Sequence, residues 1–205
     1  MHKKDTMITY KELEIYYQKL NTAFNSKETS SHYNSDRTHN AMVMCFMLDK
    51  SSSINMYCGQ LSVFRESFFN HIKKDNTDND TKNDISDELK EKLRGCLTNF
   101  LDQENVSFNV IFESYNEEYS KDLLYKDEFL SGIENDKIHF YKLDDSLSFK
   151  KDLYHFSYTN SQIVRLEQDK MKHSAICTIK DLDIYNSAKN NFLKLLSLAQ
   201  SVKIQ

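Results

Sequence analysis

The stretch of this sequence best suited to chemistry is its last third, where a histidine is followed by two carboxylates. His155 lies in the alternating run 154–158, and Glu167 and Asp169 end a second alternating run that begins at Ile163. Residues two apart on a strand share a face, so the two carboxylates predict a metal or acid–base site, and His155 is a candidate nucleophile. The alternatives are a histidine hydrogen-bonded within the sheet and a pair of carboxylates on a solvated face.

A second concentration of polar groups falls in the segments 36–40 and 57–65. Gly59 permits close approach of the backbone to a ligand, and Ser62 opens an expected helix whose first N–H groups could hold an anion. This pattern predicts a site for a small anionic or nucleotide-like ligand, and the alternative is helix capping with one buried Arg–Asp network. The residues predicted to bind the ligand are Arg37, His39, Asn40, Tyr57, Gly59, Ser62 and Arg65.

The cysteines and histidines predict no metal centre and no cofactor. None of the cysteines sits in a CxxC pair, and the histidines show no zinc-ligand spacing. Cys58, beside Gly59 and near an expected helix start, is a candidate for a lowered thiol pKa, and a nucleophilic pair with His39 or His71 is the corresponding hypothesis. The alternative to a reactive cysteine is that all four cysteines are free thiols, mostly buried, in a protein of the reducing cytoplasm: Cys45, Cys58, Cys96 and Cys177.

Composition and charge limit the classes of protein to which this chain can belong. The chain has 205 residues, enough for one domain with a real core, and its net charge of −4 gives no basic field to attract nucleic acid or anionic lipid. Nucleic acid is therefore a disfavoured partner, with a local basic run at 170–173 as the exception. No apolar run reaches the roughly 18–20 residues of a membrane span, and no signal region follows the first residues. We therefore predict a soluble, cytoplasmic protein with no membrane partner.

Hydrophobic periodicity predicts the elements that must position these groups. Helices are expected over residues 9–24, from 36 or 38 to about 50, over 62–72, 87–102 and 183–202, and towards the end of 115–130. Strands are expected over 54–58, 106–112, 137–143, 154–158, 163–167 and 175–179. The segment 26–36 is predicted to be a loop, and the Asp- and Asn-rich run 75–84 a flexible loop.

This order of elements predicts the fold class. Helices alternate with strands in the first part, so we expect a single α/β domain with a mixed, partly parallel sheet flanked by helices on both faces. The domain would span residues 1–205, with a helical part at 1–50 before the core at 53–205. At the local level, Thr9 and Glu12 predict a capping box, and Gly132 fits the C-terminal position of a helix.

The last third carries a further pattern. It consists of His155-Phe156-Ser157-Tyr158 on a strand, Thr159-Asn160-Ser161 at a turn, Ile163 to Asp169 on the return, Ser174-Ala175-Ile176-Cys177, and Phe192 on the closing helix. With the preceding elements, this pattern resembles one half of the phospholipase D superfamily, and in particular its degenerate, non-catalytic members. The resemblance covers residues 53–205 and implies a phospholipase D-like half with an N-terminal helical extension. In active members a His is the nucleophile, a Lys two residues on clamps the phosphate, and an Asp follows five residues further.

This chain departs from the active pattern, with Ser157 in the place of the Lys and Gln162 in that of the Asp. Without a cation there, the negative charge that develops on the phosphorus centre loses its main partner. We therefore predict a non-catalytic binding or scaffolding module that recognises a protein partner or an anionic ligand, or that self-associates. By association alone, such a stand-alone module suggests an accessory subunit of a bacterial multi-gene system for antiviral defence.

Two other classes of function stay open. One is a phosphodiesterase or nuclease of the phospholipase D type that uses His155 and, as a second catalytic residue, Glu167. A Lys or Arg brought beside His155 from elsewhere in the chain would favour this enzyme. The other is an oligomeric structural subunit.

Overall fold

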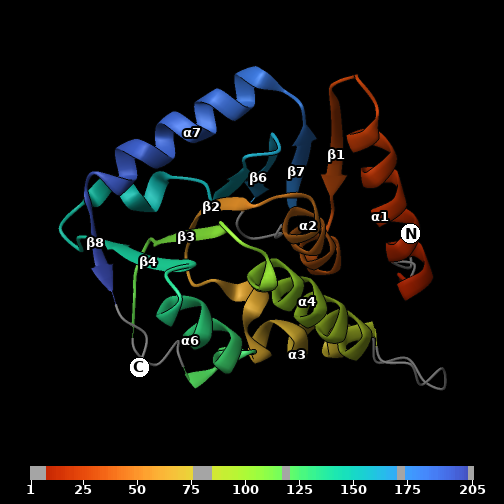
Figure 1. Ribbon diagram of the computed structural model, residues 1–205, viewed down its shortest axis with the longest axis horizontal. Helices are drawn as coiled ribbons and strands as arrows, with labels where there is room; N and C mark the ends of the chain where they lie inside the picture. Colours follow the sequence, from red (N-terminus) through yellow and green to blue (C-terminus); the bar gives the residue numbers. More distant parts are fainter. Residues whose placement is uncertain (1–7, 76–84, 117–120, 170–173, 203–205) are drawn as a thin grey trace, which may run out of the picture.

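A computed structural model describes residues 8–75, 85–116, 121–169 and 174–202, whose strands form one eight-stranded sheet (Figure 1). The strands are β1 (Ser30–Asn34), β2 (Ser53–Cys58), β3 (Ser107–Phe112), β4 (Ile138–Leu143), β5 (Phe156–Thr159), β6 (Ile163–Asp169), β7 (Ser174–Ile179) and β8 (Ala199–Val202). Their order across the sheet is β1-β7-β6-β5-β2-β3-β4-β8. Because β2, β3 and β4 run parallel and the other neighbours antiparallel, the predicted mixed sheet is confirmed. The predicted loop at 75–84 lies, but for its first residue, outside the described residues.

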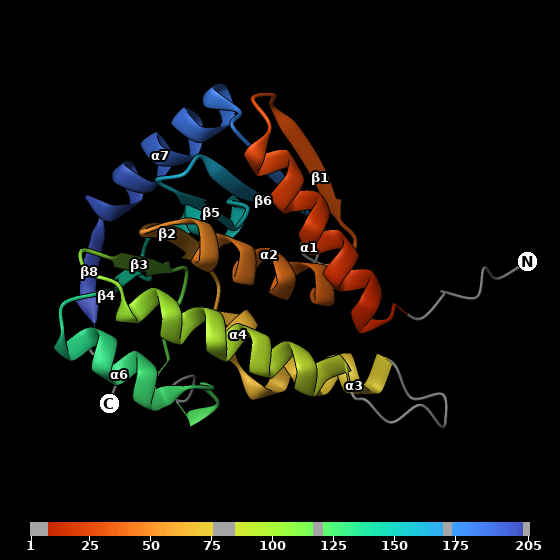
Figure 2. The same cartoon turned by 45° about the vertical axis from the view of Figure 1, so that its right-hand side comes forward.

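The helices lie on both faces of the sheet, as predicted (Figures 1 and 2). They are α1 (Tyr10–Asn25), α2 (Arg37–Lys50), α3 (Glu66–Asp75), α4 (Ile85–Asp102), α6 (Lys126–Glu134) and α7 (Leu182–Leu196). One hydrophobic core lies between α7 and the sheet and contains Tyr158 and Phe192. A larger core lies on the other face, under the remaining helices, and contains Phe46, Phe100 and Phe108.

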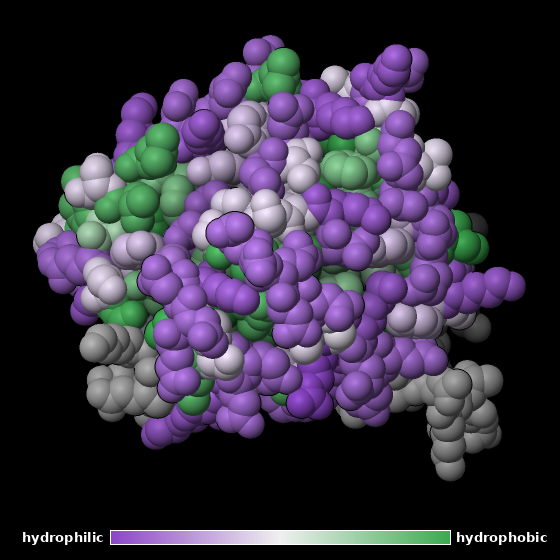
Figure 3. Space-filling model, viewed as in Figure 1, coloured by the Kyte–Doolittle hydropathy of each residue, from purple (hydrophilic) through white to green (hydrophobic). Residues whose placement is uncertain are grey.

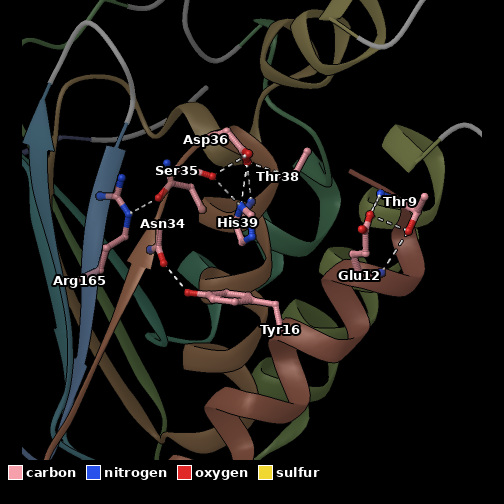
Figure 4. Close-up of polar contacts among 10 residues, drawn as sticks. Thr9, Glu12, Tyr16, Asn34, Ser35, Asp36, Thr38, His39 and Arg165 are labelled. Carbon is pink, nitrogen blue, oxygen red and sulfur yellow. Dashed lines mark hydrogen bonds and ion pairs between the residues drawn. The ribbon is translucent and has the colours of Figure 1, made fainter. Parts of the chain in front are cut away.

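Capping explains where the first two helices begin (Figure 4). The Glu12 N–H donates to the Thr9 hydroxyl at 3.2 Å, and the Thr9 N–H donates to the Glu12 carboxylate at 2.6 Å, which confirms the capping box. Asp36 caps α2 by accepting a hydrogen bond from the His39 N–H at 3.1 Å. α2 is buried along most of its length because it packs against both α1 and α4.

Two strands occur where the sequence predicts other structure, and they are the two edges of the sheet. Residues 26–36, predicted as a loop, contain β1, which pairs antiparallel with β7. The last helix, predicted to reach residue 202, ends at Leu196, and β8 follows it and pairs antiparallel with β4. An edge strand buries little apolar surface, so its sequence lacks the clear alternation that reveals an inner strand.

Two helix boundaries also differ from their predictions. The helix predicted from Ser62 is at first only a 3-10 turn, η1 (Ser62–Phe64), and α3 begins at Glu66 because Arg65 is extended between them. Gly132 lies inside α6 and not after it, since the helix is capped at Asn135.

Candidate functional site

His155 lies directly before β5 and is held on both sides by carboxylates. Its Nε2 is 2.9 Å from Oε2 of Glu113, and its Nδ1 is 3.2 Å from Oε2 of Glu167. The same Glu167 oxygen accepts a hydrogen bond from the His155 N–H at 3.1 Å, and the Glu167 N–H donates to the His155 carbonyl at 2.9 Å. These contacts fix the ring between the end of β3, which Glu113 follows, and β6, which carries Glu167.

Gly59 leaves room for this histidine. A Cβ at residue 59 would lie 3.2 Å from Cε1 and 3.4 Å from Nε2 of His155, closer than ordinary van der Waals contact to the first of these atoms. The close approach predicted for Gly59 therefore occurs, but toward the ring of His155. Tyr57, two residues earlier, faces this ring from the other core, with the two ring centroids 5.8 Å apart.

A cation reaches the same region from the neighbouring strand. Arg165 on β6 is the register partner of Ser157 on β5, and directly opposed residues of an antiparallel pair share a face. The Arg165 Nε donates to Oδ1 of Asn40 on α2 at 3.0 Å, and the side chain extends from its strand toward the start of that helix (Figure 4). Ser157 faces α2 as well, with its hydroxyl 3.5 Å from the sulfur of Met47.

His155, Arg165 and Glu167 line one cavity of about 80 Å³. Its wall combines polar groups from α2, β6 and the segment before β5 with apolar side chains of the larger core: Asn40, Met44, Met56, Cys58, Leu61, Ser62, Val63, Phe68, His155, Arg165 and Glu167. Two groups of residues that the sequence predicts separately therefore meet here. His155 and Glu167 come from the last third, and Asn40 and Ser62 come from the segments 36–40 and 57–65.

The charges around the cavity are mutually compensated. Burial alone would raise the pKa of Glu167, but the hydrogen bonds and charge of His155, with the charge of Arg165, lower it below its ordinary value. Glu167 therefore stays ionised. Burial lowers the pKa of Arg165, although the nearby charge of Glu167 acts in the opposite direction. An arginine is nevertheless charged at any physiological pH.

Three of the residues predicted to bind a ligand have other partners, and they do not line the cavity. His39 lies beside the N-cap of α2, where its Nδ1 is 3.1 Å from Asp36, and Arg37 is the first residue of that helix (Figure 4). Arg65 binds Oδ2 of Asp122 at 3.1 Å and Oε1 of Gln60 at 2.8 Å. For these residues the predicted alternative, helix capping and an Arg–Asp network, describes the structure.

Four further hypotheses are corrected. Ser62 opens only the short η1 turn, so it offers no helix N-terminus for an anion. Burial raises the pKa of Cys58 to about 12, which is opposite to the predicted direction and removes Cys58 as a nucleophile. Tyr57 is fully buried, and its hydroxyl donates to the carbonyl of Lys150 at 3.1 Å, so it does not face a ligand. Between Glu167 and Asp169 the strand register shifts, and Asp169 does not line the cavity.

Sequence reasoning missed two residues of the site, Arg165 and Glu113. The signal for Arg165 was present, because a short turn at 159–162 sets the hairpin register that places it opposite Ser157. Glu113 gave no such signal, since its approach to His155 depends on the parallel pairing of β2 with β3.

The described part of the chain contains neither a candidate metal centre nor a candidate membrane span. Among those residues, no group of three or more His, Cys, Asp or Glu side chains could hold a metal ion. Within the same ranges, no helix has the length and apolar character needed to cross a bilayer.

Comparison with known proteins shows similarity of fold at low sequence identity. No family model matches the chain, and no curated protein matches its sequence. Among solved structures, TrmBL2, an archaeal chromatin protein with a novel mode of DNA binding, is 10% identical with a TM-score of 0.51. That match covers 94% of this chain but only 62% of the TrmBL2 chain, so this chain spans less than two thirds of that protein.

Two further solved structures are also similar in fold at low sequence identity. Nuc from Salmonella typhimurium, a phospholipase D family member, is 10% identical with a TM-score of 0.48, over 86% of this chain and 99% of its own. NucT from Helicobacter pylori is 12% identical with a TM-score of 0.44, over 85% of this chain and 99% of its own. At such identities the likeness concerns the fold alone, and function must be inferred from the residues of the site.

Proposed function

We propose that this chain is a non-catalytic binding module of the phospholipase D-like type, which recognises an anionic group of a protein partner or small ligand beside Arg165. The observation that carries this proposal is the closure of His155, whose two ring nitrogens lie 2.9 and 3.2 Å from carboxylate oxygens. A histidine nucleophile must present a ring nitrogen to the phosphorus atom. Here Glu113 and Glu167 occupy both nitrogens.

Electrostatics adds to this argument against catalysis. A phosphodiester placed at Nε2 of His155 would have to displace Glu113 or lie against it. Two like charges about 4 Å apart repel by about 1 kcal/mol in water and by about 4 kcal/mol at an effective dielectric constant of roughly 20. Such repulsion acts against a negatively charged transition state, which an active site must instead stabilise.

Arg165 supplies the binding group of the proposal. Within the described part of the chain, its only side-chain hydrogen bond runs from Nε to Asn40, so its two terminal amino groups have no hydrogen-bond partner there, and the residue lines the cavity. A guanidinium presents its donors as a planar fork that matches a carboxylate or a phosphate. The two nearby carboxylates, those of Glu113 and Glu167, contact His155. Arg165 is therefore the group near the cavity that would bind an anion most favourably.

A separate surface, on the face of the sheet opposite the cavity, supports contact with a protein. On the face shown in Figure 3 most of the surface is hydrophilic, and the larger hydrophobic area lies over α7. Leu193 on α7 and Leu198 just after it are 50% and 48% exposed. Exposed apolar side chains that gather on one face are typical of surfaces that contact other proteins. A role as an accessory subunit in bacterial defence stays a prediction.

Thermal unfolding in the presence of inorganic phosphate, or of acetate, tests the proposal at matched ionic strength. A ligand that binds only the folded state raises Tm by an amount that grows with the logarithm of its concentration once that concentration exceeds Kd. We expect both anions to raise the Tm of the wild type and to lose this effect in Arg165→Met. The matched control is Arg94→Met, which removes an exposed arginine paired with Glu128 at 2.8 Å and should respond like the wild type. An equal response of Arg165→Met and the wild type would refute the proposed site.

A second candidate, a phosphodiesterase that uses His155, is favoured by one specific observation. Arg165 lines the same cavity as His155 and stands opposite Ser157, so it could replace the cation that position 157 lacks. This enzyme would require Glu113 to leave Nε2 of the histidine. Cleavage assays, described at the end of the Discussion, separate the two candidates.

A further inference from the structure

One side of the molecule, formed by β1 and α1, lies apart from the cavity described above. β1 ends the sheet, and within the described part of the chain its only strand partner is β7. α1 runs beside β1 (Figures 1 and 2), and the Tyr16 hydroxyl of α1 donates a hydrogen bond to Oδ1 of Asn34 on β1. An edge strand presents a row of backbone N–H and C=O groups to which another chain can add.

β1 lacks the features that keep edge strands from pairing with other chains. Such strands are usually protected by a charged side chain, a proline or a bulge. The five residues of β1 include no Lys and no Pro, and their register with β7 is continuous. Ser31 is exposed, and Tyr33 is 61% exposed. Burial and the charge of Lys19 lower the pKa of His32, so β1 is uncharged at pH 7 and can pair with an identical strand without opposing like charges.

The outer face of α1 continues this side of the molecule. Leu13 and Leu20 are buried in the core, so at 3.6 residues per turn residues 11, 15, 18 and 22 lie on the opposite face of the helix. A groove of about 650 Å³ follows this face and reaches Ser30, the first residue of β1. The residues of α1 that matter for the groove are Lys11, Glu14, Ile15, Gln18, Lys19 and Thr22.

The order of these residues along α1 is complementary to itself. Two copies of a helix that pack antiparallel about a two-fold axis place each residue opposite the one equally far from the axis on the other side. An axis midway between Ile15 and Gln18 places Glu14 opposite Lys19 of the second copy. Lys19 has no ion pair within the described residues. Glu14 contacts Lys92 of its own chain at 3.0 Å, and a carboxylate can accept from both lysines.

One two-fold axis, perpendicular to the sheet, can serve both elements. It would place β1 antiparallel to β1 of the second copy, and α1 antiparallel to α1, because both elements lie on the same side of the molecule. A five-residue strand alone is too small for a specific interface, which typically buries about 800 Å² of each partner. α1 has 16 residues and is about 24 Å long, so it extends the contact well beyond the strand.

We propose that the free edge of β1, together with the outer face of α1, binds a second copy of this chain about a two-fold axis and joins the two sheets into one. Each dimer then contains two Glu14–Lys19 pairs. A second copy matches this charge pattern by symmetry, which favours it over an unrelated partner. None of the residues that line the cavity takes part, so this inference is independent of the proposed function.

Sedimentation velocity of the full chain over a range of concentrations tests the proposal. We expect the wild type to show a reversible equilibrium between monomer and dimer. Lys19→Glu opposes like charges at both contacts and should raise the dimer dissociation constant by about tenfold. Adding Glu14→Lys to Lys19→Glu restores opposite charges and should restore the dimer. Ser31→Lys, which places a charge on the edge strand, should prevent dimerisation.

The matched control is Lys189→Glu, which makes the same change of charge at an exposed position on α7 and should dimerise like the wild type. Lys19 and Ser31 are both exposed, so their variants are expected to fold, which circular dichroism verifies. A wild type that stays monomeric up to about 1 mM would overturn the proposal. So would a dimer that neither Lys19→Glu nor Ser31→Lys weakens, or a double variant as weak as Lys19→Glu alone.

Discussion

At the scale of single residues, the chemistry of His155 is decided by the two carboxylates that meet it. Glu167 binds both its Nδ1 and its backbone N–H, and Glu113 binds its Nε2. Buried carboxylates are costly unless they are paired and hydrogen-bonded, so each member of this trio depends on the others. The arrangement stabilises the fold, and the proposed non-catalytic function rests on the same contacts.

Glu167→Gln tests this interdependence through pH. The pKa of Glu167 in the folded protein lies below its ordinary value of 4.5. The ionised carboxylate therefore contributes its full stabilisation of the folded protein at pH values above 4.5. This stability is lost as pH falls through the lower, folded-state pKa. We expect the substitution to lower the free energy of unfolding by about 2 kcal/mol at pH 7, and the difference from wild type to shrink below pH 4.5.

Urea unfolding monitored by circular dichroism between pH 3 and 7 measures that difference. The control is Glu104→Gln, at an exposed loop position, which should change stability little at any pH. A Glu167→Gln deficit that stays constant down to pH 3 would show that the carboxylate is not preferentially ionised in the folded protein.

The sequence predicts about half of this site. His155 and Glu167 stand out because their strands alternate regularly, and Asn40 and Ser62 because polar residues cluster near helix starts. Arg165 was overlooked although the register of its hairpin signals its position opposite Ser157. Glu113 was hidden because its position depends on parallel pairing between strands far apart in sequence. His39 and Arg65 were misassigned because local capping and ion pairing use the same residue types as ligand binding.

At the scale of elements, the inner strands and the helices follow from hydrophobic periodicity, whereas the edges do not. β1 and β8 are short, and each is paired on one side only by the described strands. β1 and β8 are strands because they pair with β7 and β4. A local sequence pattern does not contain this tertiary information. The same reason explains Gly132, whose position inside α6 depends on the approach of Ile138 at the start of β4.

The two helical glycines provide a matched test of this packing. A Cβ at Gly132 would lie 2.5 Å from Cδ1 and 2.7 Å from Cγ1 of Ile138, whereas a Cβ at Gly95, on α4, would meet nothing within 4 Å. We expect Gly132→Ala to destabilise the protein by roughly 1–3 kcal/mol through overpacking. Gly95→Ala should stabilise it by about 0.5–1 kcal/mol, because alanine is the better helix former. A Gly132→Ala variant that is as stable as the wild type or more stable in chemical unfolding would contradict the described contact.

At the scale of the whole molecule, one sheet separates two cores that share its central strands. Residue 57 of β2 belongs to the core under α7, while its neighbours Ile54 and Met56 belong to the larger core. Unfolding of the strands on the side of one core would therefore also disrupt the packing of the other core. Residues 8–50 are part of this unit, because β1 extends the same sheet and α2 packs on α4.

This architecture predicts a single cooperative unfolding transition. Phe192→Ala in the core under α7 and Phe100→Ala in the larger core should each destabilise the protein by about 3–5 kcal/mol. Both should move the same transition to lower denaturant with little change in its slope. Circular dichroism and tyrosine fluorescence in urea report this directly. Two separate transitions, with each substitution affecting only one, would show that the cores are independent.

The measurement closest to the central claim is a cleavage assay without added metal, on bis(p-nitrophenyl) phosphate and on single-stranded DNA. It compares the wild type with His155→Asn, which keeps a polar side chain near Glu113 and Glu167. Because both ring nitrogens of His155 are held by carboxylates, the account predicts no cleavage by the wild type above the level of the variant. Metal-independent cleavage by the wild type that disappears in His155→Asn would contradict it, and would establish His155 as a working nucleophile.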